Sequence, residues 1–307
     1  MRWLLFLLCP VLALAAEPLP AQRAPLAEHA LLLAVDKAGS RLVAVGEHGI
    51  VMLSDDDGAS WRQASEVPTR TTLTALSFVG DKQGWAVGHG GQVLATQDGG
   101  ERWQVLAGKI DGENSLFSVL FEDSQRGLAV GPYGYAIATT DGGKTWDTLT
   151  VGEGDDAERH LNHVMADANG RLYVMAESGG VFLSDDAGAR WRLVQTPYEG
   201  SLWSGLVRAD GSVLALGMAG HALLSRDRGE TWTELATGVD QSLTGAAELP
   251  DGRLVLVGLG GAMSMGSAAL EFAGGIRDDR QPATAVVATS KGLVLFTQGG
   301  IQHQPLP

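Results

Sequence analysis

The sequence predicts an all-β fold: a seven-bladed β-propeller of four-stranded blades, with tight aspartate-containing turns inside the blades. A Ser/Thr-x-Asp-x-Gly-x-x-Trp pattern occurs five times and a Gly-x-x-Gly-like pattern seven times, both spaced by about 42 residues. A fixed period near this length, built of strands and turns, is typical of propellers and solenoids. Glycine accounts for 42 of the 307 residues, as expected where many turns need positive φ.

The chain begins with a predicted signal peptide over residues 1–16. Arg2 gives a positive start, Trp3 to Leu14 is an apolar run too short to span a bilayer, and Ala13-Leu14-Ala15 fits a small-residue cleavage site. Cleavage would leave a mature start near Glu17, and we expect a periplasmic or secreted protein. An uncleaved membrane anchor is the alternative.

Composition narrows the classes of partner. The formal net charge is −14, which argues against nucleic acid and against anionic lipid headgroups. The single cysteine, Cys9, lies in the predicted signal, so we expect neither disulfides nor thiol chemistry in the mature chain. After signal cleavage, no segment approaches 18 uninterrupted apolar residues, and direct membrane insertion is not expected.

Residues 17–307 are predicted to form one propeller domain of seven repeats. In the second repeat, four short apolar runs separated by turn residues predict strands at 73–79, 84–87, 92–96 and 102–106. The seventh repeat ends before an outer strand can form. By repeat spacing, the segment around Glu17 is the candidate for that strand and for closing the ring.

The five aspartate turns are predicted to be structural. Aspartate accepts hydrogen bonds from backbone N–H groups ahead of it, glycine supplies positive φ, and the tryptophan pins the next strand to its neighbours. The residues in these roles are Asp56, Asp98, Asp141, Asp186 and Asp227, followed by Trp61, Trp103, Trp146, Trp191 and Trp232. The pattern resembles the Asp-box, or BNR repeat, of sialidases, sortilin-type receptors and photosystem II stability/assembly factors, and it carries little information about function.

Strand alternation predicts which face of the propeller binds a partner. The Gly-x-x-Gly turns and the loops between blades share one face, opposite the Asp-boxes, and they include the longer and more varied loops. Aromatic and arginine side chains commonly dominate protein–protein contacts. The candidate partner-binding residues on this face are Tyr133, Trp203, Tyr198, Arg159, Arg277, His48 and His89.

No catalytic residue, cofactor or metal site is predicted. A sialidase places three arginines around a carboxylate, with a tyrosine nucleophile and an acid/base aspartate, and no inner strand here opens with arginine. Asp55-Asp56-Asp57-Gly58 is explained by its Asp-box without calcium, and His48 and His89 sit at offset positions on adjacent blades, a weak signal for zinc.

Over residues 26–307 the chain resembles the photosystem II stability/assembly factor family. The resemblance rests on the repeat phrase Thr74–Val79, Gly84–Gly88 and Thr96–Gly100, echoed in the third repeat. It implies an exported seven-bladed propeller, without known catalytic residues, that assists assembly of membrane protein complexes. The arginine-rich patch of the photosynthetic members is not seen.

The resemblance therefore favours the non-photosynthetic bacterial branch. Such a protein would be a scaffold or accessory factor whose partner is an envelope membrane protein or a transporter component. A glycoside hydrolase or sugar-binding lectin that uses the same face is the alternative.

Overall fold

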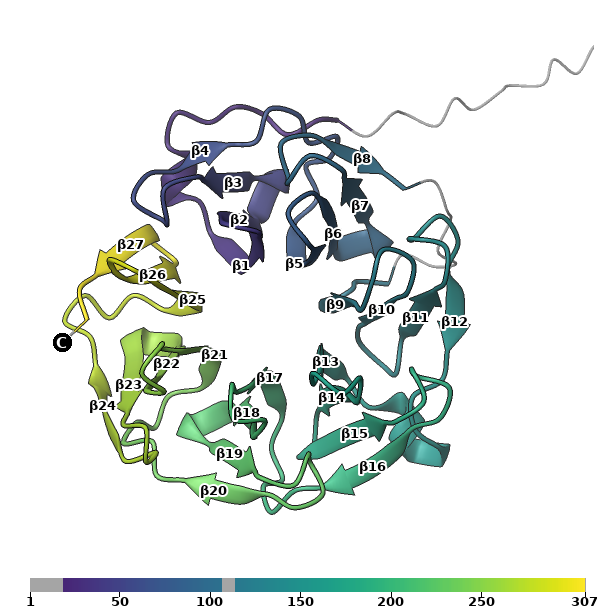
Figure 1. The fold of residues 1–307 in the computed structure, drawn as a ribbon, viewed down its shortest axis with the longest axis vertical. Coiled ribbons are helices and arrows are strands. Elements are labelled where there is room, and N and C mark those ends of the chain that lie inside the picture. The colour runs from purple at the N-terminus through teal and green to yellow at the C-terminus, as the bar shows by residue number, and fades with distance from the viewer. Residues whose placement is uncertain (1–18, 107–113, 307) are drawn as a thin grey trace, which may run out of the picture.

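Seven antiparallel sheets surround a central channel in the computed structural model, which describes residues 19–106 and 114–306 (Figure 1). The chain winds outward through each blade, so the first strand of every blade lines the channel and the last lies at the rim. The predicted seven-bladed propeller is thus confirmed. The predicted signal peptide lies outside the described residues.

Each blade runs in simple sequence order. The strands of blades 1 to 3 are β1 (Leu32–Ala38), β2 (Arg41–Gly46), β3 (Val51–Ser54) and β4 (Arg62–Gln63); β5 (Leu73–Val79), β6 (Gln83–Gly88), β7 (Val93–Thr96) and β8 (Trp103–Val105); β9 (Ser118–Phe121), β10 (Gly127–Val130), β11 (Ala136–Thr139) and β12 (Asp147–Leu149). Those of blades 4 and 5 are β13 (Leu161–Ala166), β14 (Leu172–Ala176), β15 (Gly180–Ser184) and β16 (Arg192–Gln195); β17 (Leu202–Val207), β18 (Val213–Gly217), β19 (Ala222–Ser225) and β20 (Thr233–Leu235).

Blades 6 and 7 contain β21 (Leu243–Glu248), β22 (Leu254–Gly258), β23 (Ala262–Gly266) and β24 (Phe272–Ile276), then β25 (Ala283–Thr289), β26 (Gly292–Thr297) and β27 (Gly300–Gln304). Helical structure in the described residues is limited to short 3₁₀ turns. These are η1 (Ala27–His29), η2 (Glu47–Gly49), η3 (His89–Gly91), η4 (Gly154–Glu158), η5 (Met218–Gly220) and η6 (Leu259–Gly261).

The Asp-box turns have the structural role that the sequence predicts. In the third box, the Asp141 carboxylate accepts hydrogen bonds from the Thr145 N–H at 2.9 Å and from the Thr139 hydroxyl at 2.9 Å. The Thr139 oxygen in turn accepts the Gly143 N–H, whose residue has φ +86°. Trp146 then donates its indole N–H to the Gly143 carbonyl. The box thus joins the third strand of the blade to its fourth.

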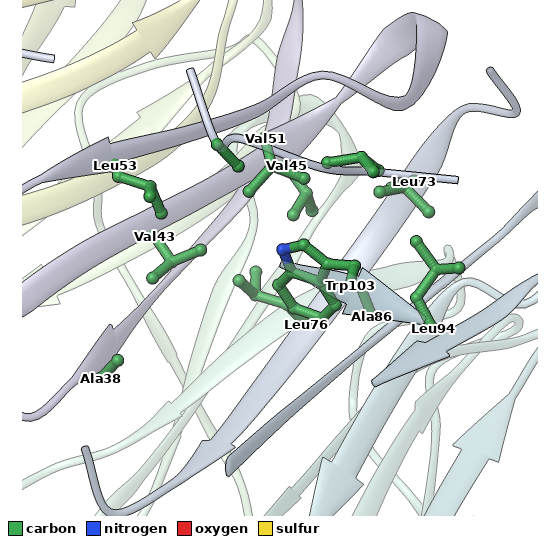
Figure 2. Close-up of a cluster of buried hydrophobic side chains, with 12 residues drawn as sticks. Ala38, Val43, Val45, Val51, Leu53, Leu73, Leu76, Ala86, Leu94 and Trp103 are labelled. Carbon is green, nitrogen blue, oxygen red and sulfur yellow. The ribbon is translucent and has the colours of Figure 1, made fainter. Parts of the chain in front are cut away.

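The box tryptophans hold neighbouring blades together. Trp103, on the outer strand of blade 2, packs with Val43 and Leu53 of blade 1 and with Leu73 and Leu94 of its own blade (Figure 2). Similar clusters lie between the other blades, so the core of this protein is distributed over the seams of the ring. Burying apolar area at each seam stabilises the ring in place of one central core.

The strand predicted to close the ring, near Glu17, lies outside the described residues. In the described residues blade 7 has only three strands, and the segment from Leu19 onward does not pair with β27. Instead Ala21 donates its N–H to the Val67 carbonyl, and Arg70 bonds the Pro20 carbonyl, beside blade 1. The closing strand near Glu17 therefore stays a prediction, and the described part of this segment, from Leu19, runs beside blade 1.

Blade 7 meets blade 1 through side-chain contacts. The Thr284 hydroxyl donates to the Leu32 carbonyl at 2.5 Å, and the Asp57 carboxylate accepts the Ser290 N–H at 2.7 Å. The bond made by Thr284 also occurs elsewhere, because Thr244 donates in the same way to the Ala283 carbonyl at 2.6 Å. The closing seam therefore uses contacts of the same kind as the other seams.

The stability of the fold should fall in acid because the box aspartates have lowered pKa values in the folded state. Hydrogen bonds from the Thr145 N–H and hydroxyl lower the pKa of Asp141 from 3.8 to about 2. The pKa of Asp227 is also about 2, chiefly through the Thr231 hydroxyl. A lowered folded-state pKa contributes stability that is complete above the unfolded value and lost as pH falls through the folded one. The melting temperature should therefore decline between about pH 4 and pH 2, and more steeply in the native chain than in Asp141→Ala. Asp155→Ala, which removes an exposed loop carboxylate, should follow the native curve.

The contribution of each threonine hydroxyl hydrogen bond across a seam to the free energy of unfolding should be measurable. Thr284→Val keeps the shape of the side chain but leaves the carbonyl of buried Leu32 without its donor, at a cost of about 1–3 kcal/mol. Thr244→Val, one seam earlier, is the matched control and should cost a similar amount in chemical denaturation. An unchanged unfolding midpoint for Thr284→Val, beside a lowered one for Thr244→Val, would show that the closing seam is held by other contacts.

Candidate functional site

The two faces of the ring carry different types of turn and loop. The Gly-x-x-Gly turns contact the loops between blades: the Gly134 N–H bonds the Arg159 carbonyl, and the Gly179 N–H bonds the Gly200 carbonyl. These turns and loops share one face, here called the loop face. The Asp-boxes, between the third and fourth strands, lie on the opposite face, here called the box face.

Exposed apolar side chains gather on the loop face. Three of the seven large hydrophobic side chains that are exposed in the described residues sit at tips of Gly-x-x-Gly turns: Tyr133 (77% exposed), Met218 (41%) and Leu259 (38%). The others lie in the N-terminal segment or on the outer strands β8 and β24, and none belongs to an Asp-box. Exposed apolar groups on one face mark it as the candidate interaction surface.

Tyr133 occupies a strained position. Its φ is +53°, at a turn position where blades 2 and 6 have the glycines Gly90 and Gly260. The ring packs against His160 at 4.5 Å between centroids, and the Tyr133 N–H bonds His160 Nδ1. A tyrosine with positive φ costs of order 1 kcal/mol relative to an unstrained residue. A strained, exposed aromatic residue is a typical feature of a functional surface.

Tyr198 lies over the neighbouring turn of blade 5. Its ring stacks on His221 at 4.3 Å, and its hydroxyl donates to the Met218 carbonyl at 3.4 Å. Burial raises the pKa of Tyr198. The Tyr198 hydroxyl is therefore tied to the turn that presents Met218, and the half-buried ring supports that turn.

Trp203 lies at the mouth of the central channel. In six of the seven blades the second residue of the first strand interrupts the strand pairing and lines or borders this mouth, and Phe117, just before β9, holds the equivalent position in blade 3. Around the ring these residues alternate in polarity until the last two: Leu33, Thr74, Phe117, Asn162, Trp203, Thr244 and Thr284. The polar members bond the carbonyl before the equivalent residue of the next blade, as Asn162 does with Leu202 at 2.9 Å. The apolar members are left to face the mouth.

The channel interior is narrow and uncharged. It encloses about 300 Å³, and its described lining includes no aspartate, glutamate, lysine or arginine. His163 is recessed in this wall and contacts the Ser118 hydroxyl, and burial lowers its pKa to about 4, so the imidazole is neutral at pH 7. His163 is not among the residues that the sequence predicted for the site. The sequence does distinguish His163 by the size of its side chain, because the equivalent positions of the other blades hold alanine, serine or glycine.

The remaining predicted residues separate into two groups. Arg159 pairs with Asp156 at 2.7 Å and donates to the Glu177 carbonyl at 3.1 Å, and Arg277 pairs with Asp279 with only 12% of its side chain exposed. Both guanidinium groups therefore bind loops of their own chain. His48, by contrast, has 79% of its side chain exposed on the loop face, and His89 is exposed on the next blade.

The described residues offer little for catalysis. No three His, Cys, Asp or Glu side chains of residues 19–106 and 114–306 are grouped as a metal ion would require. The channel lining lacks the pair of carboxylates that glycoside hydrolysis normally uses. Nor does any helix in this part of the chain have the length and apolar character needed to cross a membrane.

Comparison with solved structures finds the same ring in other proteins. A YCF48 structure bound to a D1 peptide matches with a TM-score of 0.74 and 18% identity over 95% of this chain and all of that one. YCF48 from Cyanidioschyzon merolae matches with a TM-score of 0.71 and 16% identity over 91% and 97%. An ancestral GH74 enzyme reaches 0.69 at 13% identity, over 92% of this chain but 45% of the enzyme.

Comparison with curated proteins found no significant match. The family model described as photosynthesis system II assembly factor YCF48 matches residues 59–272, more than two thirds of the chain. It spans all five Asp-box tryptophans, from Trp61 to Trp232. On this match, the protein belongs to the YCF48 family of photosystem II assembly factors.

Proposed function

We propose that this protein is a non-catalytic, protein-binding assembly factor that holds a segment of a membrane protein on its loop face. The observation that carries the proposal is the gathering of exposed apolar side chains on that face, around a channel mouth that bears Phe117 and Trp203. Family membership supports it, as does the relative solved with a bound D1 peptide.

The chemistry of the surface indicates how such a partner would be held. Tyr133, Met218 and Leu259 offer apolar contacts at turn tips, and Trp203 offers a large ring at the centre. Rigid aromatic groups bury area at low cost in conformational entropy and are frequent hot spots. The neutral channel mouth favours an apolar side chain of the partner, because burying a charged group there would leave it unpaired.

We further propose that the chain is exported by residues 1–16 and works in the periplasm or outside the cell. The partner would be an envelope membrane protein complex or a transporter component. The predicted signal sequence and the absence of cysteine from the rest of the chain support this location.

Trp203→Ala is the first test of the loop face. Immobilised native protein should capture a membrane protein, identified by mass spectrometry, from detergent-solubilised envelope membranes of the source cells. The substitution should weaken binding of that protein by about 1–3 kcal/mol, as expected for a hot-spot aromatic residue. Lys144→Glu, in an exposed Asp-box position, is the control for the other face and should bind as the native protein does. Normal capture by Trp203→Ala together with loss in Lys144→Glu would place the binding site on the box face.

Tyr133→Gly separates binding from folding. Glycine relieves the strain at φ +53° by about 1 kcal/mol, which offsets the lost contact with His160. The melting temperature should therefore be maintained while affinity for the partner falls. Ser178→Gly, at the same turn position of blade 4 with φ +54°, gives the backbone relief without removing an aromatic ring and should leave binding unchanged. Equal affinities of the two variants for the partner would show that Tyr133 is not part of the interface.

A further inference from the structure

The seams between blades are normally filled by one side chain from the second strand of the preceding blade. This side chain faces the box glycine of the next blade. A methyl group built on that glycine would lie 2.7 Å from Val294 at the 7/1 seam and 3.2 Å from Val43 at the 1/2 seam. At the 4/5 seam the distance to Tyr173 is 3.0 Å, and at the 2/3 seam Trp85 lies at 3.4 Å behind a closer contact, Leu106 of the same blade, at 2.8 Å. Little space is left at these four places.

The 3/4 seam is different. The equivalent residue is Leu128, and it is not among the nearest neighbours of the box glycine, Gly188. A methyl group on Gly188 would have 3.6 Å to its nearest atom, which belongs to Trp191. The seams on either side have the indole of Trp85 and the phenol of Tyr173 at the equivalent position, whereas this seam has the smaller Leu128.

A pocket of about 240 Å³ occupies this place. A cavity of about 150 Å³ lined by apolar side chains is large enough to bind benzene in another protein. The lining is mainly aliphatic and comes from both blades: Leu120, Leu128, Ala138, Leu149, Leu172 and Ala189.

The pocket also lacks the arginine bridge that covers two other seams. Arg171 donates to the Arg228 carbonyl and to the Glu230 carboxylate of the next blade, and Arg41 makes the equivalent contacts at the 1/2 seam. Arg126 holds the same position at the 3/4 seam, but Ala189 replaces the glutamate. Arg126 pairs with Asp123 of its own blade and is half exposed at the pocket.

Two polar groups at this seam lack the hydrogen bond that their equivalents in other blades make. The carbonyls equivalent to that of Ala187 accept a side-chain bond from the preceding blade, from Trp85 Nε1 at Gly142 and from Arg171 at Arg228. No such bond reaches Ala187, which lines the pocket. The Trp191 indole N–H is buried and unpaired, whereas the four other box tryptophans bond their box glycine.

We propose that the 3/4 seam is a binding pocket for an aromatic group of indole or phenol size that carries one N–H or O–H donor. The ring would lie where Trp85 and Tyr173 lie in the neighbouring seams, and its donor would bond the Ala187 carbonyl as Trp85 bonds Gly142. The site is on the box face and is separate from the channel mouth. The aromatic group is either a free small molecule or a side chain presented by a partner.

Calorimetric titration of the whole protein with indole, phenol and toluene tests the pocket. Indole and phenol should bind and raise the melting temperature, and toluene, which lacks the donor, should bind at least tenfold more weakly. Equal binding of toluene would overturn the role of the donor. N-acetyltryptophanamide distinguishes the sources: binding as tight as that of indole assigns the pocket to a side chain on a peptide, and its exclusion assigns the pocket to a free molecule.

Leu128→Trp should fill the pocket from within. It is expected to raise the melting temperature by a few degrees and to weaken indole binding at least tenfold, and Leu128→Phe should do the same to a smaller extent. Val43→Trp is the matched control at the filled 1/2 seam, where Val43 is fully buried. It should lower the melting temperature and leave indole binding unchanged. No indole binding to the native protein, or undiminished binding to a folded Leu128→Trp or Leu128→Phe variant, would overturn the proposal.

Discussion

The fold depends on close contact between an Asp-box glycine and a side chain of the blade before it, a contact made at four of the five boxes. The box hydrogen bonds hold glycine in a positive φ, which brings its Cα down onto the neighbouring blade, and the box tryptophan packs beside it. Because the glycine has no side chain, the preceding blade decides how well the seam is filled. Valine, tyrosine and tryptophan all serve, so the same turn can join blades of different composition.

Repetition explains what the sequence predicted well. The box residues and the Gly-x-x-Gly turns recur because the blades use the same turns to connect the same strands. Their spacing was enough to count seven blades and to separate the two faces. Closure of the ring occurs once and has no repeated signal. The N-terminal strand near Glu17 was inferred from spacing alone and lies outside the described residues, whereas Pro20 and Ala21 bond Arg70 and Val67 beside blade 1.

Unique positions were harder to interpret. Arg159 and Arg277 were natural candidates for a partner by residue type, but each satisfies carbonyls or carboxylates of its own loops. His163 and Leu128 were missed because neither is unusual as a residue. Each is notable only against its equivalents in other blades, and only when the space across the seam or channel is known. Tyr133 and Trp203 were predicted from residue type and repeat position, which a sequence does display.

The number of residues at the channel mouth is odd, and this limits how polar and apolar residues can alternate around it. Apolar and polar residues alternate from Leu33 to Thr244, but a ring with an odd number of members cannot alternate all the way round, and two neighbours must be alike. Here the like pair is Thr244 and Thr284, on the two sides of blade 7. Blade 7, which has three strands in the described residues, therefore has a hydrogen bond of this kind at both of its seams, while every other blade has one. An even-numbered relative of this ring could alternate without a defect, and would have no such doubly fastened blade.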